Sequence, residues 1–247
     1  LMALAGIGAD LEGIHSVAAA LSAGRITRIT VERGRLKHAD VASVVERARM
    51  LSIPIDHVDD VRPMATTTAP QGILAAARPI EPTTLKAAVQ NTENPALVVL
   101  DHIEDPRNVG AIARSAVAAG MTAMVVPSRR SAPLGATAFK AAVGALEQLP
   151  IVVVSSIADA LKRTSQLGLW NVGLDGESDR SLFGLEILAQ PLALCIGAEG
   201  EGLSRLVKDR CDVIAAIPMV GQTESLNASI ATALASFEVA RIRGWVS

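Results

Sequence analysis

Two patterns of apolar and polar positions divide the chain. Up to about residue 80, short segments of different type alternate. Helical spacing is found at 15–22 and 39–51, and strand patterns lie at 26–32, 53–58 and 72–76. In the strand at 26–32, β-branched residues alternate with polar ones, as in a sheet with one buried face. We therefore expect a small α/β domain over residues 1–78.

From residue 96 the apolar runs become continuous. They lie at 96–101, 123–127, 150–155, 169–174, 192–197 and 213–218. Helical spacing separates most of them, at 112–119, 136–146 and 203–210, and a long helical segment follows at 226–243. Continuous Val, Ile and Leu runs between helices are typical of strands buried on both faces. The pattern predicts a parallel-sheet α/β domain over residues 96–247, joined to the first by a proline-containing linker at 79–95 with one helical turn.

Composition narrows the class of protein. The 247 residues carry a formal net charge of −2, which excludes nucleic-acid binding through bulk positive charge. The two cysteines, Cys195 and Cys211, exclude a disulfide framework, and their spacing gives no metal-binding pair. There is no Tyr, with three Phe and two Trp, which argues against a platform that stacks RNA bases on aromatic rings.

The chain shows no sign of export or membrane insertion. No apolar run approaches the ~20 residues of a membrane span. The first ten residues contain no Lys or Arg, so no signal peptide is expected. These features predict a cytoplasmic protein. The lack of a metal-binding spacing predicts that it binds no metal.

Polar residues that carry chemistry are concentrated after three of the predicted strands. They occupy 105–114, 197–204 and 218–229, and no other strand is followed by a comparable stretch. Ligands bind beyond the carboxyl ends of strands in open parallel sheets, so we expect the three stretches to meet at one edge.

Taken singly, each stretch has an ordinary structural interpretation. The spacing of the glycines after the fifth apolar run is the reverse of the dinucleotide-binding fingerprint. These glycines, Gly197, Gly200 and Gly202, suit a plain strand-to-helix turn at least as well as a cofactor-binding loop. Asn108 suits a helix cap, and Arg114 a solvated helix position. The Gly-Gln-Thr-Glu-Ser run before the last helix suits an N-terminal cap.

Taken together, the three stretches resemble the motifs of the SpoU (TrmH-like) family of RNA ribose 2′-O-methyltransferases. The matching segments are DPRNVGAIARSAVAAG (105–120), LCIGAEGEGLS (194–204) and IPMVGQTESLNASIATAL (217–234). The resemblance covers residues 96–243. It implies a trefoil-knotted domain of the SPOUT class, S-adenosylmethionine as cofactor, and a homodimer formed through the knotted domain.

The resemblance also implies which residues hold the cofactor. Gly197, Ile217 and Leu226 match positions that bind it largely through backbone groups, with Met219 and Gly221 as neighbours. An adenine ring needs apolar walls and backbone donors and acceptors, which suits this set.

Five further residues match the family's functional positions: Asn108, Arg114, Glu199, Ser225 and Asn227. A guanidinium is essentially always protonated, so Arg114 is a poor base on its intrinsic pKa. We favour a role for Arg114 in positioning the ribose and activating it electrostatically, with a base role as the alternative. Glu199 is expected to orient Arg114 by a bidentate pair, and Ser225 and Asn227 to reach Arg114 or the ribose.

The first domain carries a second resemblance. GIHSVAAAL (13–21) and the later 69–73 segment are similar to the ribosomal-protein-L30e-like RNA-binding domain that precedes the catalytic domain in some SpoU enzymes. This plan favours a guanosine of 23S rRNA over tRNA as substrate. RNA contacts are expected from scattered cations: Arg107, Arg129, Arg130 and Lys140 in the second domain, and Arg25, Arg28, Arg33, Arg35 and Lys37 in the first.

Other functions stay open at this point. A tRNA ribose methyltransferase or an antibiotic-resistance rRNA methyltransferase would share the motifs. A non-catalytic RNA-binding assembly factor is disfavoured because the functional positions are intact. A nucleotide-binding dehydrogenase is disfavoured by the reversed glycine order.

Overall fold

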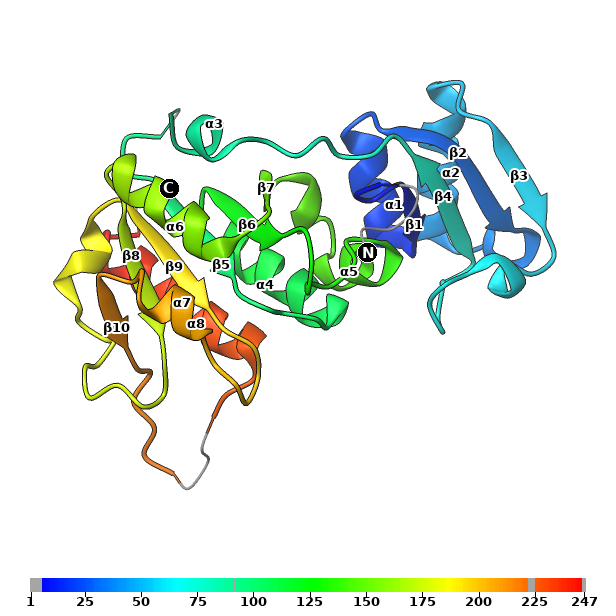
Figure 1. Cartoon of the computed structure of the whole chain (residues 1–247). Helices are drawn as coiled ribbons and strands as arrows, with labels where there is room; N and C mark the ends of the chain where they lie inside the picture. The colour runs from blue at the N-terminus through cyan, green and yellow to red at the C-terminus, as the bar shows by residue number, and fades with distance from the viewer. Residues whose placement is uncertain (1–5, 91, 222–224, 246–247) are drawn as a thin grey trace.

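A computed structural model describes residues 6–90, 92–221 and 225–245. The N-terminal unit is a mixed four-stranded sheet in the order β1-β4-β2-β3 with two helices (Figure 1). Its elements are β1 (Asp10–Glu12), α1 (Ile14–Ser22), β2 (Ile26–Glu32), α2 (Ala39–Met50), β3 (Ile55–Val58) and β4 (Ile73–Ala77). β4 pairs antiparallel with β1 and β2, whereas β2 and β3 are parallel.

The second unit is built on a six-stranded sheet in the order β10-β8-β9-β5-β6-β7, and each of its pairings is parallel. The strands are β5 (Ala96–Leu100), β6 (Ala123–Pro127), β7 (Ile151–Val154), β8 (Trp170–Leu174), β9 (Leu192–Ile196) and β10 (Val213–Ala215). β5 and β9 lie side by side at the centre, with Val99 opposite Cys195. The predicted parallel-sheet α/β fold is confirmed.

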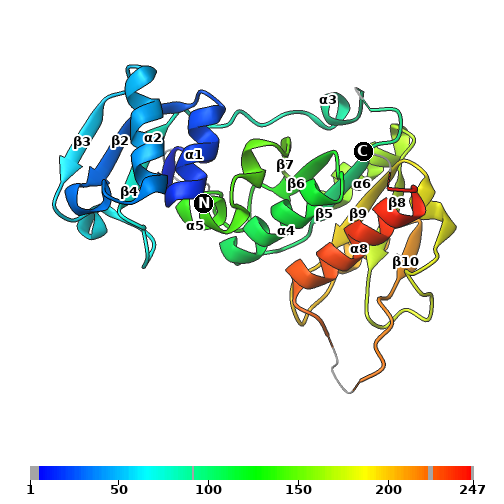
Figure 2. The same cartoon turned by 180° about the vertical axis from the view of Figure 1, so that it is seen from behind.

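Helices cover both faces of this sheet, which explains why its strands read as continuous apolar runs. The helices are α4 (Pro106–Ala118), α5 (Ala136–Ala142), α6 (Ile157–Gln166), α7 (Arg205–Lys208) and α8 (Ala228–Ile242). Along β5, Val98 and Leu100 pack in the core under α4, α5 and α8, whereas Leu97 and Val99 pack with α6 and α7 on the other face. Figure 2 shows α4 and α8 lying next to each other on the first of these faces.

The segment expected to be a linker is packed against the second unit. It contains α3 (Leu85–Gln90), whose Leu85, Ala88 and Val89 join the core that α6 and α7 cover. The Thr83 N–H also donates to the Ile151 carbonyl at 2.8 Å, at the edge strand β7.

An internal interface joins the two units. The Arg25 guanidinium forms a two-armed ion pair with Glu147, with Nε 2.8 Å from Oε2, and lies 5.8 Å from the centre of the Phe139 ring. Lys140 donates to the Ala69 carbonyl. Arg25 and Lys140 were expected to face RNA, and the structure assigns both to this interface instead.

One predicted helix is shorter than its pattern indicates. The segment 136–146 breaks after α5 because Val143 and Gly144 adopt left-handed conformations, with φ of 50° and 89°. A short 3-10 turn, Ala145–Glu147, follows and carries Glu147 to the interface. None of the helices in the described part of the chain has the length and apolar character that a membrane crossing requires.

Candidate active site

The first turn of α4 presents Asn108 at the carboxyl edge of the sheet. Asp105 caps the helix by accepting the Arg107 N–H at 2.8 Å, and Pro106 occupies the first turn, where no amide donor is needed. A Cβ on Gly110 would lie 2.3 Å from the Ala138 carbonyl oxygen, so only glycine allows α4 to approach α5 this closely. This close contact holds α4, the helix that carries Asn108, against α5.

The loop after β9 presents Glu199. It folds back on itself, with the Gly202 N–H donating to the Ala198 carbonyl at 2.9 Å. A Cβ on Gly197 would lie 2.0 Å from the Gly202 carbonyl carbon, so this turn requires glycine. The buried Asp101 accepts the Ser204 N–H at 2.7 Å and anchors the end of the loop to β5.

Asn227 begins the last helix and faces the other two segments. Its Oδ1 caps α8 by accepting the Ser229 N–H at 2.9 Å and the Ser229 hydroxyl at 2.6 Å. With Oδ1 used in the cap, Nδ2 is left to donate to Asn108 Oδ1 at 3.0 Å and to Glu199 Oε1.

The three predicted stretches therefore meet in one hydrogen-bonded cluster. Asn108 Nδ2 donates to Glu199 Oε1 at 2.7 Å, and the Ala228 N–H donates to the same oxygen at 3.3 Å. Asn108 is half-buried, and Glu199 and Asn227 are exposed. The prediction that the motifs converge at one sheet edge is confirmed.

A cavity of about 520 Å³ adjoins this cluster. It is lined by four of the five residues predicted to bind a cofactor, which are Gly197, Ile217, Met219 and Leu226, and also by Glu199 and Ser225. Gly221 is exposed and lies outside the lining. Gln222, Thr223 and Glu224 of the third motif fall outside the described residues.

Three charged residues of the lining fall outside the three predicted polar stretches: Asp175, Glu177 and Lys208. Lys208 Nζ pairs with Asp175, and the Glu177 N–H donates to Asp175 Oδ1 at 3.0 Å. Burial opposes ionisation of Asp175, but the hydrogen bonds from Lys208 and Glu177 outweigh it and lower the pKa of this carboxyl. Asp175 directly follows β8, so the rule of the carboxyl edge, applied to this strand too, would have found it.

Arg114 lies apart from the cluster. It is exposed on α4, and its side chain makes no hydrogen bond or ion pair within the described residues. The expected pair between Glu199 and Arg114 is not formed within the described residues, where Asn108 and Asn227 bond to Glu199. Six residues on a helix turn by about 600°, so Asn108 and Arg114 point about 120° apart.

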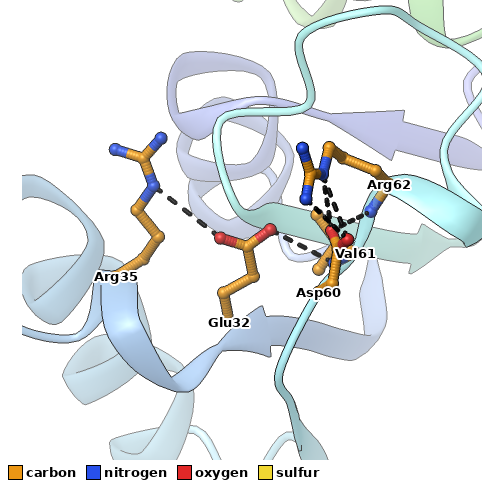
Figure 3. Close-up of polar contacts among 5 residues, drawn as sticks. All are labelled: Glu32, Arg35, Asp60, Val61 and Arg62. Atoms are coloured by element: carbon orange, nitrogen blue, oxygen red, sulfur yellow. Dashed lines mark hydrogen bonds and ion pairs between the residues drawn. The ribbon is translucent and has the colours of Figure 1, made fainter.

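The expected basic face of the N-terminal unit is largely neutralised by carboxylates. Arg28 pairs with Asp56 at 2.8 Å and Arg33 with Asp59 at 2.6 Å. Figure 3 shows a third case, in which Glu32 lies between Arg35 Nε, at 3.8 Å, and the Val61 N–H, at 3.2 Å. In the same view Arg62 pairs with Asp60.

Two family models match the chain. The model of the SpoU rRNA methylase family matches residues 95–237, which include all three motifs. The chain belongs to this family. The model of the RNA 2′-O ribose methyltransferase substrate-binding domain matches residues 11–83, the N-terminal unit of this SpoU family member.

Relatives and solved structures agree with the assignment. The 23S rRNA (guanosine-2′-O-)-methyltransferase RlmB of Photobacterium profundum is 37% identical over 240 residues, covering 94% of this chain and 96% of that protein. The enzyme of the same name from Pseudomonas aeruginosa is 38% identical over 239 residues, covering 94% and 95%. The SpoU methyltransferase AviRb of Streptomyces viridochromogenes, solved with AdoMet, is 25% identical with a TM-score of 0.79, covering 95% and 90%.

Proposed function

We propose that this SpoU family member is an S-adenosylmethionine-dependent methyltransferase that methylates the ribose 2′-hydroxyl of a guanosine in 23S rRNA. The observation that carries the proposal is the hydrogen-bonded cluster of Asn108, Glu199 and Asn227 at the wall of a cavity of about 520 Å³. Curated relatives that align with 94% of the chain bear the name of this rRNA activity.

The cavity suits the cofactor chemically. Its volume lies within the ~300–1,000 Å³ of small-molecule sites. Ile217, Met219 and Leu226 offer apolar walls for an adenine, and the 197–202 turn offers backbone groups. The carboxylates of Asp175 and Glu177 suit hydroxyl donors and positive charge. A contact between Gly221 and the cofactor stays a prediction, because Gly221 lies outside this lining.

When bound, S-adenosylmethionine would supply a methyl group on a sulfonium, and its transfer would form the ribose O–CH₃ bond, break the S–CH₃ bond and give up the hydroxyl proton to solvent. The protein's part is alignment and removal of water. Asn108, Asn227 and the Ala228 N–H all bond to Oε1 of Glu199, which leaves Oε2 to accept a hydrogen bond from the ribose hydroxyl. Ser225 lines the same cavity and would contact the ribose.

Arg114 would act by positioning. Its exposed place on α4 lets the guanidinium meet an RNA phosphate next to the target ribose. The phosphate contact would then hold the ribose in line for transfer, whereas electrostatic activation by Arg114 stays a prediction because this residue lies apart from the cluster.

The expected homodimer and cellular location follow from the same proposal. We infer a homodimer through α8, where Ile230, Leu234 and Phe237 share one helix face with exposed fractions of 52%, 39% and 38%. The trefoil knot stays a prediction. Since the substrate would be rRNA, we place the enzyme in the cytoplasm.

A methyl-transfer assay tests the function. Unmodified 23S rRNA and total tRNA are incubated with the protein and labelled cofactor, and ribose methylation is mapped. We expect one 23S guanosine to be modified, and Arg114→Ala to lower the rate on the order of a hundredfold or more. Arg163→Ala, which removes an exposed arginine of α6, is the matched control and should leave the rate unchanged.

The other outcomes discriminate among the alternatives. Transfer to tRNA alone would replace the substrate but keep the reaction. Cofactor binding without transfer to either RNA would favour a non-catalytic role or an assembly-dependent substrate. Absence of cofactor binding would refute the proposal.

A further inference from the structure

A second cavity, of about 510 Å³, also borders the hydrogen-bonded cluster of Asn108, Glu199 and Asn227, the catalytic cluster of the proposed function. Asn108 lines it, and it shares Ala198, Glu199 and Glu201 with the first cavity. Its remaining lining residues are His102, Ile103, Glu104, Asp105 and Arg130. If the 2′-hydroxyl of the target ribose lies at the wall that the two cavities share, the base or the phosphate of the same nucleotide can reach the second cavity.

The charges of the lining favour the base over the phosphate. Among the described residues of the lining, four carry carboxylates, which are Glu104, Asp105, Glu199 and Glu201, and Arg130 is the one that is always cationic. An RNA phosphate would be repelled by this excess of negative charge. A neutral group rich in hydrogen-bond donors would be favoured, because carboxylates are strong acceptors.

Two of the four carboxylates are free to bind such a group. Asp105 is used in capping α4, and Glu199 is bonded within the catalytic cluster. Glu104 and Glu201 are exposed, and within the described residues neither makes a hydrogen bond or an ion pair.

We propose that the second cavity receives the base of the target nucleotide, and that Glu104 and Glu201 select guanine by accepting hydrogen bonds from its N1–H and N2–H₂ groups. Guanine is the only RNA base with an imino and an amino donor side by side on its Watson–Crick edge, the edge by which proteins read unstacked bases. Arg130 can donate to guanine O6 or N7. The inference rests on the proposed function and extends it to the choice of base.

The test compares guanosine with inosine at the mapped target position. Inosine keeps N1–H and O6 but lacks the N2 amino group. RNA fragments that differ only at this nucleotide are methylated at saturating cofactor, and kcat/KM is measured for each. We expect the wild-type protein to prefer guanosine by roughly ten- to a hundredfold, the effect of a hydrogen bond to a charged group.

The variants Glu104→Gln and Glu201→Gln, singly and together, remove the negative charge with little change in shape. We expect the double variant to lose most of the preference, so that guanosine and inosine differ by less than about threefold. Glu186→Gln is the matched control, since Glu186 is exposed and lines neither cavity. Its preference should equal that of the wild type. Cofactor affinity is measured for each variant, because Glu201 also lines the first cavity.

Equal rates on guanosine and inosine in the wild type would overturn the inference while leaving the methyltransferase intact. A wild-type preference kept in the double variant would also overturn it. Absence of methylation on either RNA would instead refute the proposed function, and the base-binding role would fall with it.

Discussion

Replacing Glu147 with Ala should destabilise the protein by breaking the ion pair that joins its two units. The side chains of Arg25 and Glu147 are only 12% and 5% exposed, so the pair is almost entirely shielded from water. Removing the carboxylate leaves the guanidinium buried without a counter-charge. Removing one partner of a buried pair typically costs about 3–5 kcal/mol, far more than the pair itself contributes.

Other contacts of Arg25 place the expected cost at the lower end of that range. Its guanidinium also donates to the carbonyls of Gly8, at 3.2 Å, and Arg78, and it lies over the Phe139 ring. These contacts survive the substitution and keep part of the charge solvated by the protein. We therefore expect the free energy of unfolding to fall by about 3 kcal/mol.

Urea unfolding measures this loss of free energy of unfolding when the two units are observed separately. Both tryptophans, Trp170 and Trp245, lie in the second unit, so fluorescence reports on it alone. Hydrogen exchange measured by mass spectrometry follows the N-terminal sheet. The matched control is Asp56→Ala, which breaks the exposed pair with Arg28 and should cost at most about 1 kcal/mol.

A double substitution, Arg25→Met with Glu147→Leu, separates the ion pair from simple packing. Removing both charges leaves neither unpaired, although the carbonyls of Gly8 and Arg78 lose a donor, so this variant should be clearly more stable than Glu147→Ala. If Glu147→Ala costs no more than Asp56→Ala, or if the double variant is as unstable as Glu147→Ala, the reasoning from buried charge is refuted.

Three further predictions concern other parts of the chain. Asn171→Leu should lower the free energy of unfolding by about 3 kcal/mol in urea titrations, because the fully buried Asn171 amide bonds to side-chain and carbonyl groups that would lose their partner. A hydrogen bond from Arg241 lowers the pKa of Glu238 below 4.5, so its stabilisation is present above that pH and is lost as the pH falls through the lowered pKa. Glu238→Gln should accordingly be less stable near neutral pH and lose less stability on acidification, as followed by thermal unfolding at several pH values. Leu234→Asp should convert the inferred dimer to a monomer in light scattering, and an unchanged mass would exclude α8 as the interface.

The core of the second unit was predictable because it depends on local patterning. The run at 123–127 became β6 with the same bounds, and 192–197 became β9 with one residue fewer. Strands buried on both faces need apolar side chains at every position, and such runs are conspicuous in a sequence that is 50% hydrophobic. By contrast, β1 has only three residues and depends on pairing with β4, so no local pattern marks it.

The site was predictable as a set of residues but not as a set of contacts. The motifs named Asn108, Glu199 and Asn227, which the structure brings together. They also named Arg114, which helix geometry turns away from the other three. The break at Val143 was not predictable from helical spacing, because a β-branched residue rarely adopts the left-handed conformation that Val143 has here.

The pairing of charges changes where RNA contacts are expected. The sequence placed five cations within thirteen residues of the N-terminal unit, but four of them, Arg25, Arg28, Arg33 and Arg35, face carboxylates. A cation already paired releases fewer counterions from RNA and contributes less to affinity. Arg107, Arg129 and Arg130 are exposed and unpaired within the described residues, and Arg130 also lines the second cavity. The salt-dependent part of RNA binding should therefore depend more on Arg107 and Arg129 than on the N-terminal four, which puts the phosphate contacts next to the cavity proposed to read the base.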